Sequence, residues 1–550
     1  MLREFFKQRI QRGLVRRLNN RTIARVAKRV ARQSPPPSAA PVVFFKASTG
    51  IDDLSWNSGF HLLTSWALRL KGIPIVYFAC HSGMSHCVLG TNRDHVHKAP
   101  PCKSCIYQSR TLYADMQENM ETSKKVAPPA SHVHWFDYQR DSQLAAAIER
   151  LSLQDLMIFE WQNIPLGRLC LPGLRWILRI HHLNDDESTR YLLREYILSA
   201  WNAAREFSKL LDETKPRAVI VFNGQFYPEA TARYIAQQRG IRVITHEVGL
   251  QPASAFFTEG EATAYPIHIP DEFELNDEQN AKLDAYLAKR FQGNFTMAGI
   301  KFWADMKGLD ADASFLQKTA GFKQIVPIFT NVIFDTSQPH ANTVFEDMFD
   351  WLDMTLGVIR AHPETLFVIR AHPDELRVRK SSRETVAAWV EASGADKESN
   401  VIFVAPNESL SSYELIQKSK FVMVYNSTIG LEASIMGAAV LCAGKARFTQ
   451  YPTVFFPQTA DEVRGMMEQF LDVDKIAVPP EFTRNARRFL YYQLFRTSLP
   501  FGDFLEPSVR TTQTRLKSFK LEKLSPENSK AIEAVFDGLL NNGDFLLKDS

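Results

Sequence analysis

The sequence lacks the short motifs that mark several common enzyme classes. It contains no Gly-x-x-x-x-Gly-Lys-Ser/Thr, His-Glu-x-x-His or Gly-x-Ser-x-Gly segment, and no Gly-x-Gly-x-x-Gly follows an apolar run. These absences argue against a P-loop kinase, a zinc protease, an α/β-hydrolase and a dinucleotide-dependent dehydrogenase. No Asp-x-Asp follows a predicted strand either. We therefore expect chemistry that needs no cofactor or divalent metal, with basic side chains and helix dipoles stabilising developing charge.

Long hydrophobic runs are missing as well. No apolar stretch reaches the roughly 18–20 residues that cross a bilayer, and the N-terminus has positive charge without the apolar core of a signal peptide. Cysteine is scarce, with 6 in 550 residues. These features predict a cytoplasmic protein whose cysteines are reduced thiols or metal ligands.

The net charge of +4 is unevenly distributed. Residues 1–33 contain 11 Lys or Arg and one acidic residue, which leaves a balance of about −6 for the remainder and argues against a nucleic-acid groove in the body. Apolar residues recur at helical spacing between these cations: Leu2, Phe5, Phe6, Ile10, Leu14 and Leu18. Such a basic amphipathic helix indicates peripheral binding to the anionic inner face of a membrane. A helix packed on the protein's own core, or a disordered tail, would fit the same pattern.

A chain of 550 residues is too long for one hydrophobic core. We expect a basic arm and Pro-rich linker over 1–40, a first Rossmann-like domain over 41–320, a second over 321–475, and a helical tail over 476–550 that packs back on the body. Within the first domain, residues 155–159 are expected to form a strand, and residues 277–291 a helix.

Four apolar runs in the second domain alternate with segments of helical period, which predicts βαβ units and a parallel sheet. Each run ends in polar residues: Arg370 and His372; Asn407 and Glu408; Asn426, Ser427 and Thr428; Lys445 and Arg447. Asn331 lies where the first strand of this domain ends. Because ligands bind outside the carboxyl ends of parallel strands, these groups are expected to converge on one phosphate- or sugar-binding edge.

The segment VIRAHP occurs twice, at 358–363 and at 368–373. The first copy ends a predicted helix, so its proline is expected only to terminate that helix. The second copy follows a strand, which places Arg370 and His372 at the functional edge as phosphate or carboxylate ligands. Both copies could also be simple proline-marked element ends.

Asn426, Ser427 and Thr428 open a predicted helix, whose free amides favour an anion. Ordinary helix capping would use the same residues. Glu432, one turn further on, is a candidate to accept hydrogen bonds from ribose hydroxyls, or else a solvated helix carboxylate.

Together, HPDE after a strand, YNSTIGLEASIMGAAVLCAG and FTNVIFDT resemble the donor-binding half of GT-B glycosyltransferases, in particular the capsule polysaccharide biosynthesis group, which includes Kdo transferases. FNGQFYPEATARYIAQQRGIRVITHEVG (222–249) fits the same group, so the resemblance covers roughly 219–451. It implies an α/β fold of two Rossmann-like domains whose parallel sheets face each other across a cleft, with the basic helix and C-terminal helices added. It also implies Asn331, Arg370, His372, Ser427, Thr428, Glu432 and Lys445 as donor-binding residues.

In this arrangement, the first domain presents the strand end after RVITHEV to the donor. A carboxylate there can deprotonate an acceptor hydroxyl, so Glu247 is the first candidate for the catalytic base and His246 the second, with His372 as a catalytic group on the donor side. A solvent-facing glutamate at a strand end would show the same pattern.

Cys80, Cys87, Cys102 and Cys105 have the spacing C-x6-C-x14-C-x2-C within an irregular excursion expected over 80–135. The Cys-x2-Cys pair in PPCKSC predicts a tight knuckle suited to a structural zinc. The first pair has no standard zinc spacing, so a buried strand-end cysteine and an incidental loop remain the alternatives.

The combined expectation is a glycosyltransferase that moves a sugar from a nucleotide-sugar to a surface polysaccharide or glycolipid precursor. The same motifs would also fit transfer of a glycerol- or polyol-phosphate from a CDP-linked donor. A non-catalytic membrane-associated scaffold of the same shape is the third possibility.

Overall fold

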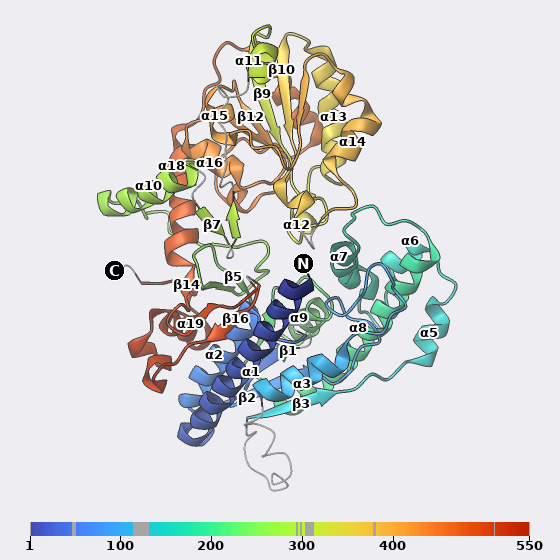
Figure 1. The fold of residues 1–550 in the computed structure, drawn as a ribbon, viewed down its shortest axis with the longest axis vertical. Coiled ribbons are helices and arrows are strands. Elements are labelled where there is room, and N and C mark those ends of the chain that lie inside the picture. The colour runs from blue at the N-terminus through green and yellow to red at the C-terminus, as the bar shows by residue number, and fades with distance from the viewer. Residues whose placement is uncertain are drawn as a thin grey trace.

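The computed structural model describes residues 2–46, 51–113, 131–292, 295–297, 300–302, 313–377, 381–510 and 512–548, with side chains in the first helix described from Ile10 onward. Residues 114–130 of the expected excursion therefore lie outside the described residues, as do the side chains of Leu2, Phe5 and Phe6. The described chain forms two lobes, each built on its own sheet (Figure 1).

The first domain is built on a seven-stranded sheet in the order β14-β6-β5-β4-β1-β2-β3. Its parallel strands are β1 (Val42–Lys46), β2 (Ile75–Cys80), β3 (His132–Phe136), β4 (Ala218–Phe222) and β5 (Arg242–Val248); β6 (Ser254–Thr258) and β14 (Leu499–Pro500) run antiparallel at one edge. β1, β2 and β4 are almost wholly buried because helices cover both faces, which explains their continuous apolar sequences.

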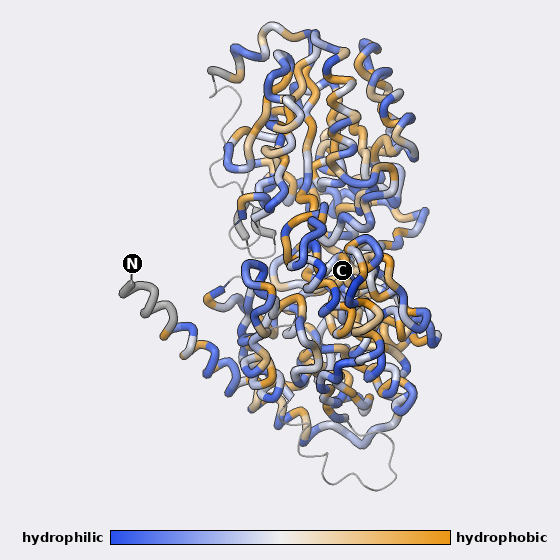
Figure 2. The backbone as a smooth tube through the Cα atoms, turned by 90° about the vertical axis from the view of Figure 1, so that its right-hand side faces the viewer, coloured by the Kyte–Doolittle hydropathy of each residue, from blue (hydrophilic) through white to orange (hydrophobic). Residues whose placement is uncertain are grey.

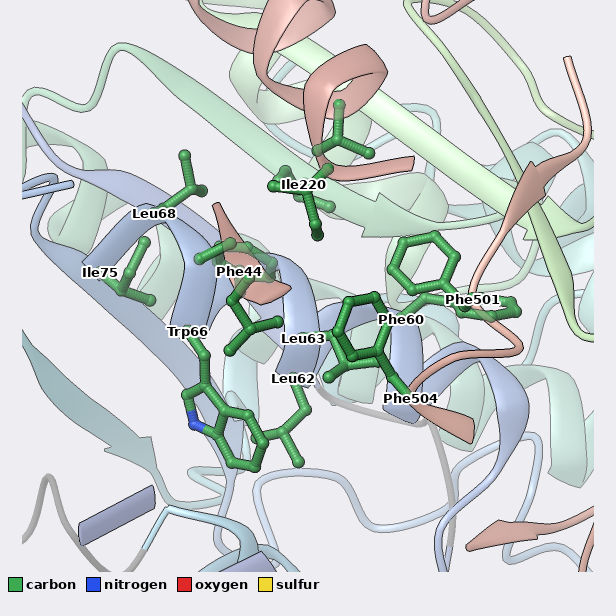
Figure 3. Packing of buried hydrophobic residues seen from close by; sticks show 14 of the residues in the cluster. Phe44, Phe60, Leu62, Leu63, Trp66, Leu68, Ile75, Ile220, Phe501 and Phe504 are labelled. Carbon is green, nitrogen blue, oxygen red and sulfur yellow. The ribbon is translucent and has the colours of Figure 1, made fainter. Parts of the chain in front are cut away.

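Helices pack on the two faces of this sheet: α2 (Trp56–Leu70), α3 (Cys102–Leu112), α5 (Ser142–Ile148), α6 (Leu153–Met157), α7 (Leu166–Leu178), α8 (Glu187–Thr214) and α9 (Glu229–Gln238). On one face, Phe44 of β1 and Ile220 of β4 pack with Phe60 and Trp66 of α2 (Figure 3). Phe501, from the C-terminal part of the chain, enters the same cluster, so this core is built from segments far apart in the sequence.

The second domain is a five-stranded, entirely parallel sheet in the order β11-β10-β9-β12-β13. Its strands are β9 (Gln324–Phe329), β10 (Thr365–Arg370), β11 (Val401–Val404), β12 (Val422–Val424) and β13 (Val440–Cys442). Its helices are α12 (Gln338–Ala341), α13 (Met348–Ala361), α14 (Val386–Ser393), α15 (Ser412–Gln417), α16 (Ile429–Ile435) and α17 (Ala460–Asp472). The chain leaves β9 toward β10 on one side and later returns to β12 on the other, so a crevice forms between these two strand ends.

The fold class expected from the sequence is confirmed: two Rossmann-like α/β domains with parallel-rich sheets. Two local expectations were wrong. Residues 155–159 are not a strand, because α6 occupies Leu153–Met157 and the Ser152 side chain caps it at the amide of Asp155. Cys102 and Cys105 do not lie in a tight knuckle, because they occupy the first turn of α3.

Three further helices connect or flank the lobes: α10 (Asp277–Phe291), α18 (Pro480–Tyr491) and α19 (Lys530–Leu540). α10 was expected in the first domain, but Leu283 and Leu287 pack into the core on the second domain's side. α18 lies along both lobes in Figure 1 and leads to β14, which pairs with β6 of the first sheet. The tail therefore packs back on the first domain.

The basic N-terminal helix α1 (Leu2–Gln33) divides into two halves. From Asn19 onward it packs on the first domain, where Ile23 and Val30 are fully buried and Asn19 hydrogen-bonds Thr514 and Leu516. The preceding half, as described from residue 10 to residue 18, projects away from the body (Figure 2). Ile10, Leu14 and Leu18 are 64%, 55% and 60% exposed on one helical face. Among the described residues, no helix is long and apolar enough to cross a membrane.

A bridge of charges joins the two domains beside the cleft. His182, in the loop after α7, lies with Nε2 2.7 Å from Asp347 Oδ2, and its Nδ1 contacts Glu384 of the second domain. Asp347 and Glu384 raise the pKa of His182 to about 10. Burial opposes ionisation of both carboxyls, yet His182 lowers the pKa of each. The geometry is that of an imidazolium held between two carboxylates, which fastens the second domain to the first.

We expect His182→Gln to lower the melting temperature at pH 7 and to cost less as the pH rises. The folded pKa of His182 is above its unfolded value of about 6.5, so its stabilisation is complete below that pH and is lost as the pH passes through about 10. Calorimetry of the wild type and of His182→Gln between pH 7 and 10 measures the difference in melting temperature. His268→Gln, at an exposed position, is the control. A difference in melting temperature that is constant over that range contradicts the bridge.

Candidate functional site

The crevice between β9 and β12 is lined by two asparagines that hold each other. Asn331 follows β9 and Asn426 follows β12, and Asn331 Nδ2 donates to Asn426 Oδ1 at 2.6 Å. Asn331 also accepts the amide of Val332 at 2.8 Å. These bonds fix the loops after both strands, and they place Asn331 where the sequence predicted a ligand-binding group.

A cavity of about 290 Å³ opens above this crevice and is lined by both domains. The second domain contributes most of its wall: Asn331, Val332, Phe334, Asp335, Ser337, His340, His372, Asp374, Asn426, Ser427, Thr428, Lys445, Ala446, Arg447 and Phe448. Trp176 of α7 and the 263–264 segment contribute the first domain's side. In Figure 1, α12 lies at the tip of the second domain facing α7. A cavity in this place suits a small polar ligand held between two lobes.

His372 lies at the junction of this cavity with a second one of about 130 Å³. Its Nδ1 accepts the backbone amide of Asp374 at 3.1 Å, at the start of a short 3-10 turn. A neutral imidazole that accepts at Nδ1 has its proton on Nε2. Burial lowers the pKa of His372, although Asp374 and Asp335 oppose this effect. The ring is therefore held as a neutral donor, which suits an anionic oxygen.

Arg370 ends β10 and lines the second cavity together with His372, Ser427 and Thr428. It is only 4% exposed, and burial lowers its pKa to about 10. A guanidinium with little hydration at a cavity wall is well suited to bind a phosphate. The second copy of the repeated motif thus reaches the cavities. His362 of the first copy ends α13 and is not among the residues that line either cavity.

Ser427 and Thr428 line both cavities at the start of α16. Gly430 lets the start of α16 lie close to β12, since a Cβ at this position would lie 2.9 Å from Val424 of β12. α16 has only seven residues, so its dipole is short and the side chains provide most of the binding capacity. Lys445, which is exposed, adds a cation to the lining of the larger cavity.

Glu432 lines the smaller cavity, but its carboxylate is already engaged. Oε1 lies 2.6 Å from Arg290 Nη2, and Oε2 accepts the hydroxyl of Tyr413 at 2.5 Å. Arg290 belongs to α10, so this buried pair fastens that helix to the second domain. The ribose-binding role of Glu432 stays a prediction beside this anchoring role.

The two acceptor-side candidates on β5 face opposite sides of the sheet. His246 is completely buried against Phe257 and His61, and burial, helped by Lys46, lowers its pKa to about 3. It has no hydrogen-bond partner among the described residues and faces the core rather than the cleft. Glu247 faces the other way and accepts Asn223 Nδ2 at 3.0 Å. Neither residue is among those that line the two cavities, so the catalytic role of Glu247 stays a prediction.

The structure adds a cluster that the sequence did not indicate. His340 Nε2 of α12 lies 3.3 Å from Glu261 Oε2 and 2.9 Å from both Gln225 and Thr263. Glu261 also pairs with Arg233 at 2.6 Å. Burial lowers the pKa of His340, and Glu261 opposes this. The long irregular connection after β9, at the switch point, is the sequence signal that could have drawn attention to His340.

The four cysteines lie around one apolar cavity at the carboxyl end of β2. Burial raises the pKa of Cys87 to about 12 and that of Cys80 well above the usual range. Buried thiols of this kind bind metal only with loss of their protons. Zinc binding stays a prediction.

Part of the chain that forms this site matches a known protein family. Residues 302–452 match the family described as "Capsule polysaccharide biosynthesis protein". No curated protein matches the chain.

Several solved structures are similar to the chain. Among them is the beta Kdo 2,4 transferase of Thermosulfurimonas dismutans KpsC, with 11% identity, a TM-score of 0.35, and coverage of 56% of this chain and 87% of that one. The beta Kdo 2,7 transferase of the same KpsC has 12% identity, a TM-score of 0.31, and coverage of 58% and 86%. The UDP-GlcNAc 2-epimerase of Neisseria meningitidis, bound to UDP-GlcNAc, has 12% identity, a TM-score of 0.22, and coverage of 82% and 99%.

With TM-scores this low, these similarities do not bear on the activity of this chain. The family match does bear on the site, because residues 302–452 include the whole second sheet and all seven residues predicted to bind a donor. The resemblance seen in the sequence is confirmed over this segment, which matches the capsule polysaccharide biosynthesis family.

Proposed function

We propose that this protein is a glycosyltransferase of capsule synthesis that takes a sugar from a nucleotide-sugar and adds it to a glycan or glycolipid acceptor. The observation that supports this most is the cavity at the β9–β12 switch point, walled by both domains and lined by basic and hydroxyl side chains. The family match of the second domain agrees with it.

In this proposal, the donor phosphates occupy the junction of the two cavities. Arg370 and His372 contact the phosphate oxygens from the end of β10, and Ser427 and Thr428 contact them from the start of α16. Lys445 contacts them from the loop after β13. These groups stabilise the nucleotide as it leaves, because fixed donors aimed at developing negative charge lower the barrier. Cleavage of the bond between sugar and phosphate therefore needs no group outside this chain in the proposed scheme.

The acceptor hydroxyl approaches from the first domain, where a base takes its proton. Glu247 is the candidate indicated by the sequence. The His340–Glu261 pair is the candidate indicated by the geometry, because His340 itself lines the cavity. Glu247→Gln and Glu261→Gln, compared for turnover at saturating donor, separate the two: loss of turnover with retained donor binding identifies the base.

The function is tested by incubating the full chain with CMP-, UDP- and GDP-sugars and measuring nucleotide release and product mass. The proposal is supported if one nucleotide-sugar is accepted and the product contains its sugar but no phosphorus from the donor. Phosphorus retained in the product indicates polyol-phosphate transfer instead. If the chain binds no nucleotide-sugar of the panel and releases no nucleotide, the enzymatic proposal is wrong.

We also propose that the projecting half of α1 binds an anionic membrane surface. Ile10, Leu14 and Leu18 are exposed on one face, and Arg12, Arg16 and Arg17 lie among them. We expect the full chain to sediment with vesicles rich in phosphatidylglycerol, less so at high salt because screening shortens charge interactions to about 8 Å at physiological ionic strength.

A chain that begins at Asn19 keeps the packed half of α1 and is expected to stay in the supernatant while it retains nucleotide binding. The double variant Leu14→Ser, Leu18→Ser preserves every charge and measures the apolar contribution. Equal sedimentation of the full and shortened chains would exclude α1 as the membrane anchor.

A further inference from the structure

Cys80, Cys87, Cys102 and Cys105 come from three parts of the first domain and line the same cavity. Cys80 ends β2, Cys87 lies in the loop that follows, and the other two lie in the first turn of α3. All four are free thiols, and the rest of the lining is predominantly apolar, with Ile51, Met84, Leu89 and Ile106 among it. Four thiols around one apolar cavity form a soft ligand set, which selects zinc, copper(I) or iron–sulfur clusters.

The spacing of the four cysteine sulfurs favours an iron–sulfur cluster over a single metal ion. In the described part of the chain, His181, His182 and Asp347 are the only three His, Cys, Asp or Glu residues whose ligand atoms lie within 4.8 Å of one another. No three of the cysteine sulfurs therefore come that close. A zinc ion bonded to four thiolates at about 2.3 Å holds every pair of sulfurs within about 3.8 Å. An iron–sulfur cluster spreads its cysteines more widely, because iron and sulfide lie between them.

A backbone amide supports one of the thiols: the amide of Gly83 donates to Cys80 Sγ at 3.2 Å. In the equivalent turn, the amide of Gly90 donates to the carbonyl oxygen of Cys87 at 3.1 Å. A Cβ on Gly90 would lie 2.8 Å from Cys87 Sγ, so glycine is required for this approach. Both pairs have the sequence Cys-x-x-Gly. Hydrogen bonds to cysteine sulfur are a recurring support of iron–sulfur clusters.

Lys46 supplies a positive charge beside the same cavity. It ends β1, next to β2, and is 6% exposed, with Nζ donating to Ser58 at 2.7 Å. Cys105 of the cavity is close enough to Lys46 to interact with it electrostatically. A negatively charged centre in the cavity would stabilise the buried ammonium, and the ammonium would in turn offset the excess charge of four thiolates.

We propose that Cys80, Cys87, Cys102 and Cys105 bind an iron–sulfur cluster that has a structural role. The cluster would fasten the loop between β2 and α3 to the strand ends. Leu89, Gly90 and Pro101 line the cysteine cavity and also an open groove that reaches Trp176. Trp176 lines the interdomain cavity, so the cluster would shape the first domain's approach to the cleft and leave the donor-binding wall untouched.

The test is to purify the full chain without oxygen and measure iron, acid-labile sulfide and zinc. We expect iron and acid-labile sulfide in equal amounts, about two or four of each per chain, with broad visible absorbance that dithionite bleaches and an electron paramagnetic resonance signal in the reduced state. One zinc per chain without sulfide overturns the proposal in favour of a single-ion site, and absence of all three overturns it in favour of an ordinary buried loop.

Variants locate the ligands. Cys102→Ser and Cys105→Ser are expected to lose iron and sulfide together and to increase hydrogen exchange over residues 81–112, while exchange around β10 and α16 is unchanged. Cys170→Ser is the matched control, since Cys170 is buried in α7 away from the cavity, and it should retain full iron and sulfide. Equal iron content in Cys105→Ser and wild type would contradict the ligand assignment, and this measurement does not depend on transferase activity.

Discussion

Replacing His372 with asparagine is expected to weaken donor binding by about 10- to 100-fold, because a hydrogen bond to a charged phosphate is worth about 1.5–3 kcal/mol. Asparagine is chosen because its side-chain oxygen can still accept the amide of Asp374, as His372 Nδ1 does. The turn is thereby preserved, and only the Nε2 donor is removed. Titration calorimetry with the accepted nucleotide-sugar measures the loss.

The chain provides a matched control for this experiment. His362 lies in the other copy of the same six-residue motif, but at the end of α13, where it contacts Glu364. His362→Asn is expected to change donor affinity by less than about twofold. If His372→Asn binds the donor as tightly as wild type, or if both variants lose affinity equally, the phosphate role of His372 is wrong.

Arg290→Leu is expected to cost about 3–5 kcal/mol of stability in the second domain, because it leaves the Glu432 carboxylate buried without its cation. The side chains of Arg290 and Glu432 are 11% and 5% exposed, so solvent cannot compensate. The unfolding transition of the second domain, followed by calorimetry, measures the loss. Arg484→Leu breaks an exposed ion pair with Glu274 and is expected to cost no more than about 1 kcal/mol.

The double variant Arg290→Leu, Glu432→Leu separates anchoring from ribose binding. An apolar pair in place of a buried ion pair is often neutral, so most of the lost stability should return. If Glu432 also binds ribose, the stable double variant will still bind donor weakly. A single variant that melts like wild type would show that the pair does not fasten α10.

The strands of the second sheet, and β1, β2, β4 and β5 of the first, could be predicted from sequence because helices cover both faces, so their apolar runs are continuous. β3, β6 and β14 of the first sheet were not predicted. The choice between the two VIRAHP copies was possible for a similar reason: one follows a strand and the other ends a helix. Residues 155–159 were misjudged because apolar content was weighed above the Ser152-x-x-Asp155 capping pattern.

The site was less accessible to sequence reasoning. Adjacent strand residues point to opposite faces, so His246 and Glu247 could not both face the cleft, and this could have been foreseen. The contact between Glu261 and His340 joins two domains, and no local pattern encodes it. The same holds for Arg290 and Glu432, which pair across 142 positions of the chain. Such contacts follow from the tertiary fold alone.

The meeting of distant segments in the first domain has a consequence for synthesis. β14 completes the edge of the first sheet, and Asn19 of α1 hydrogen-bonds Thr514 and Leu516. During translation, the first domain emerges long before these residues, so β6 and the inner face of α1 must wait until β14 and residues 514–516 have been made. Because unpaired strand edges and exposed apolar faces favour aggregation, the nascent chain should depend on chaperones until residues 499–516 are released. The second sheet, contiguous from 324 to 442, has no such delay and can form first.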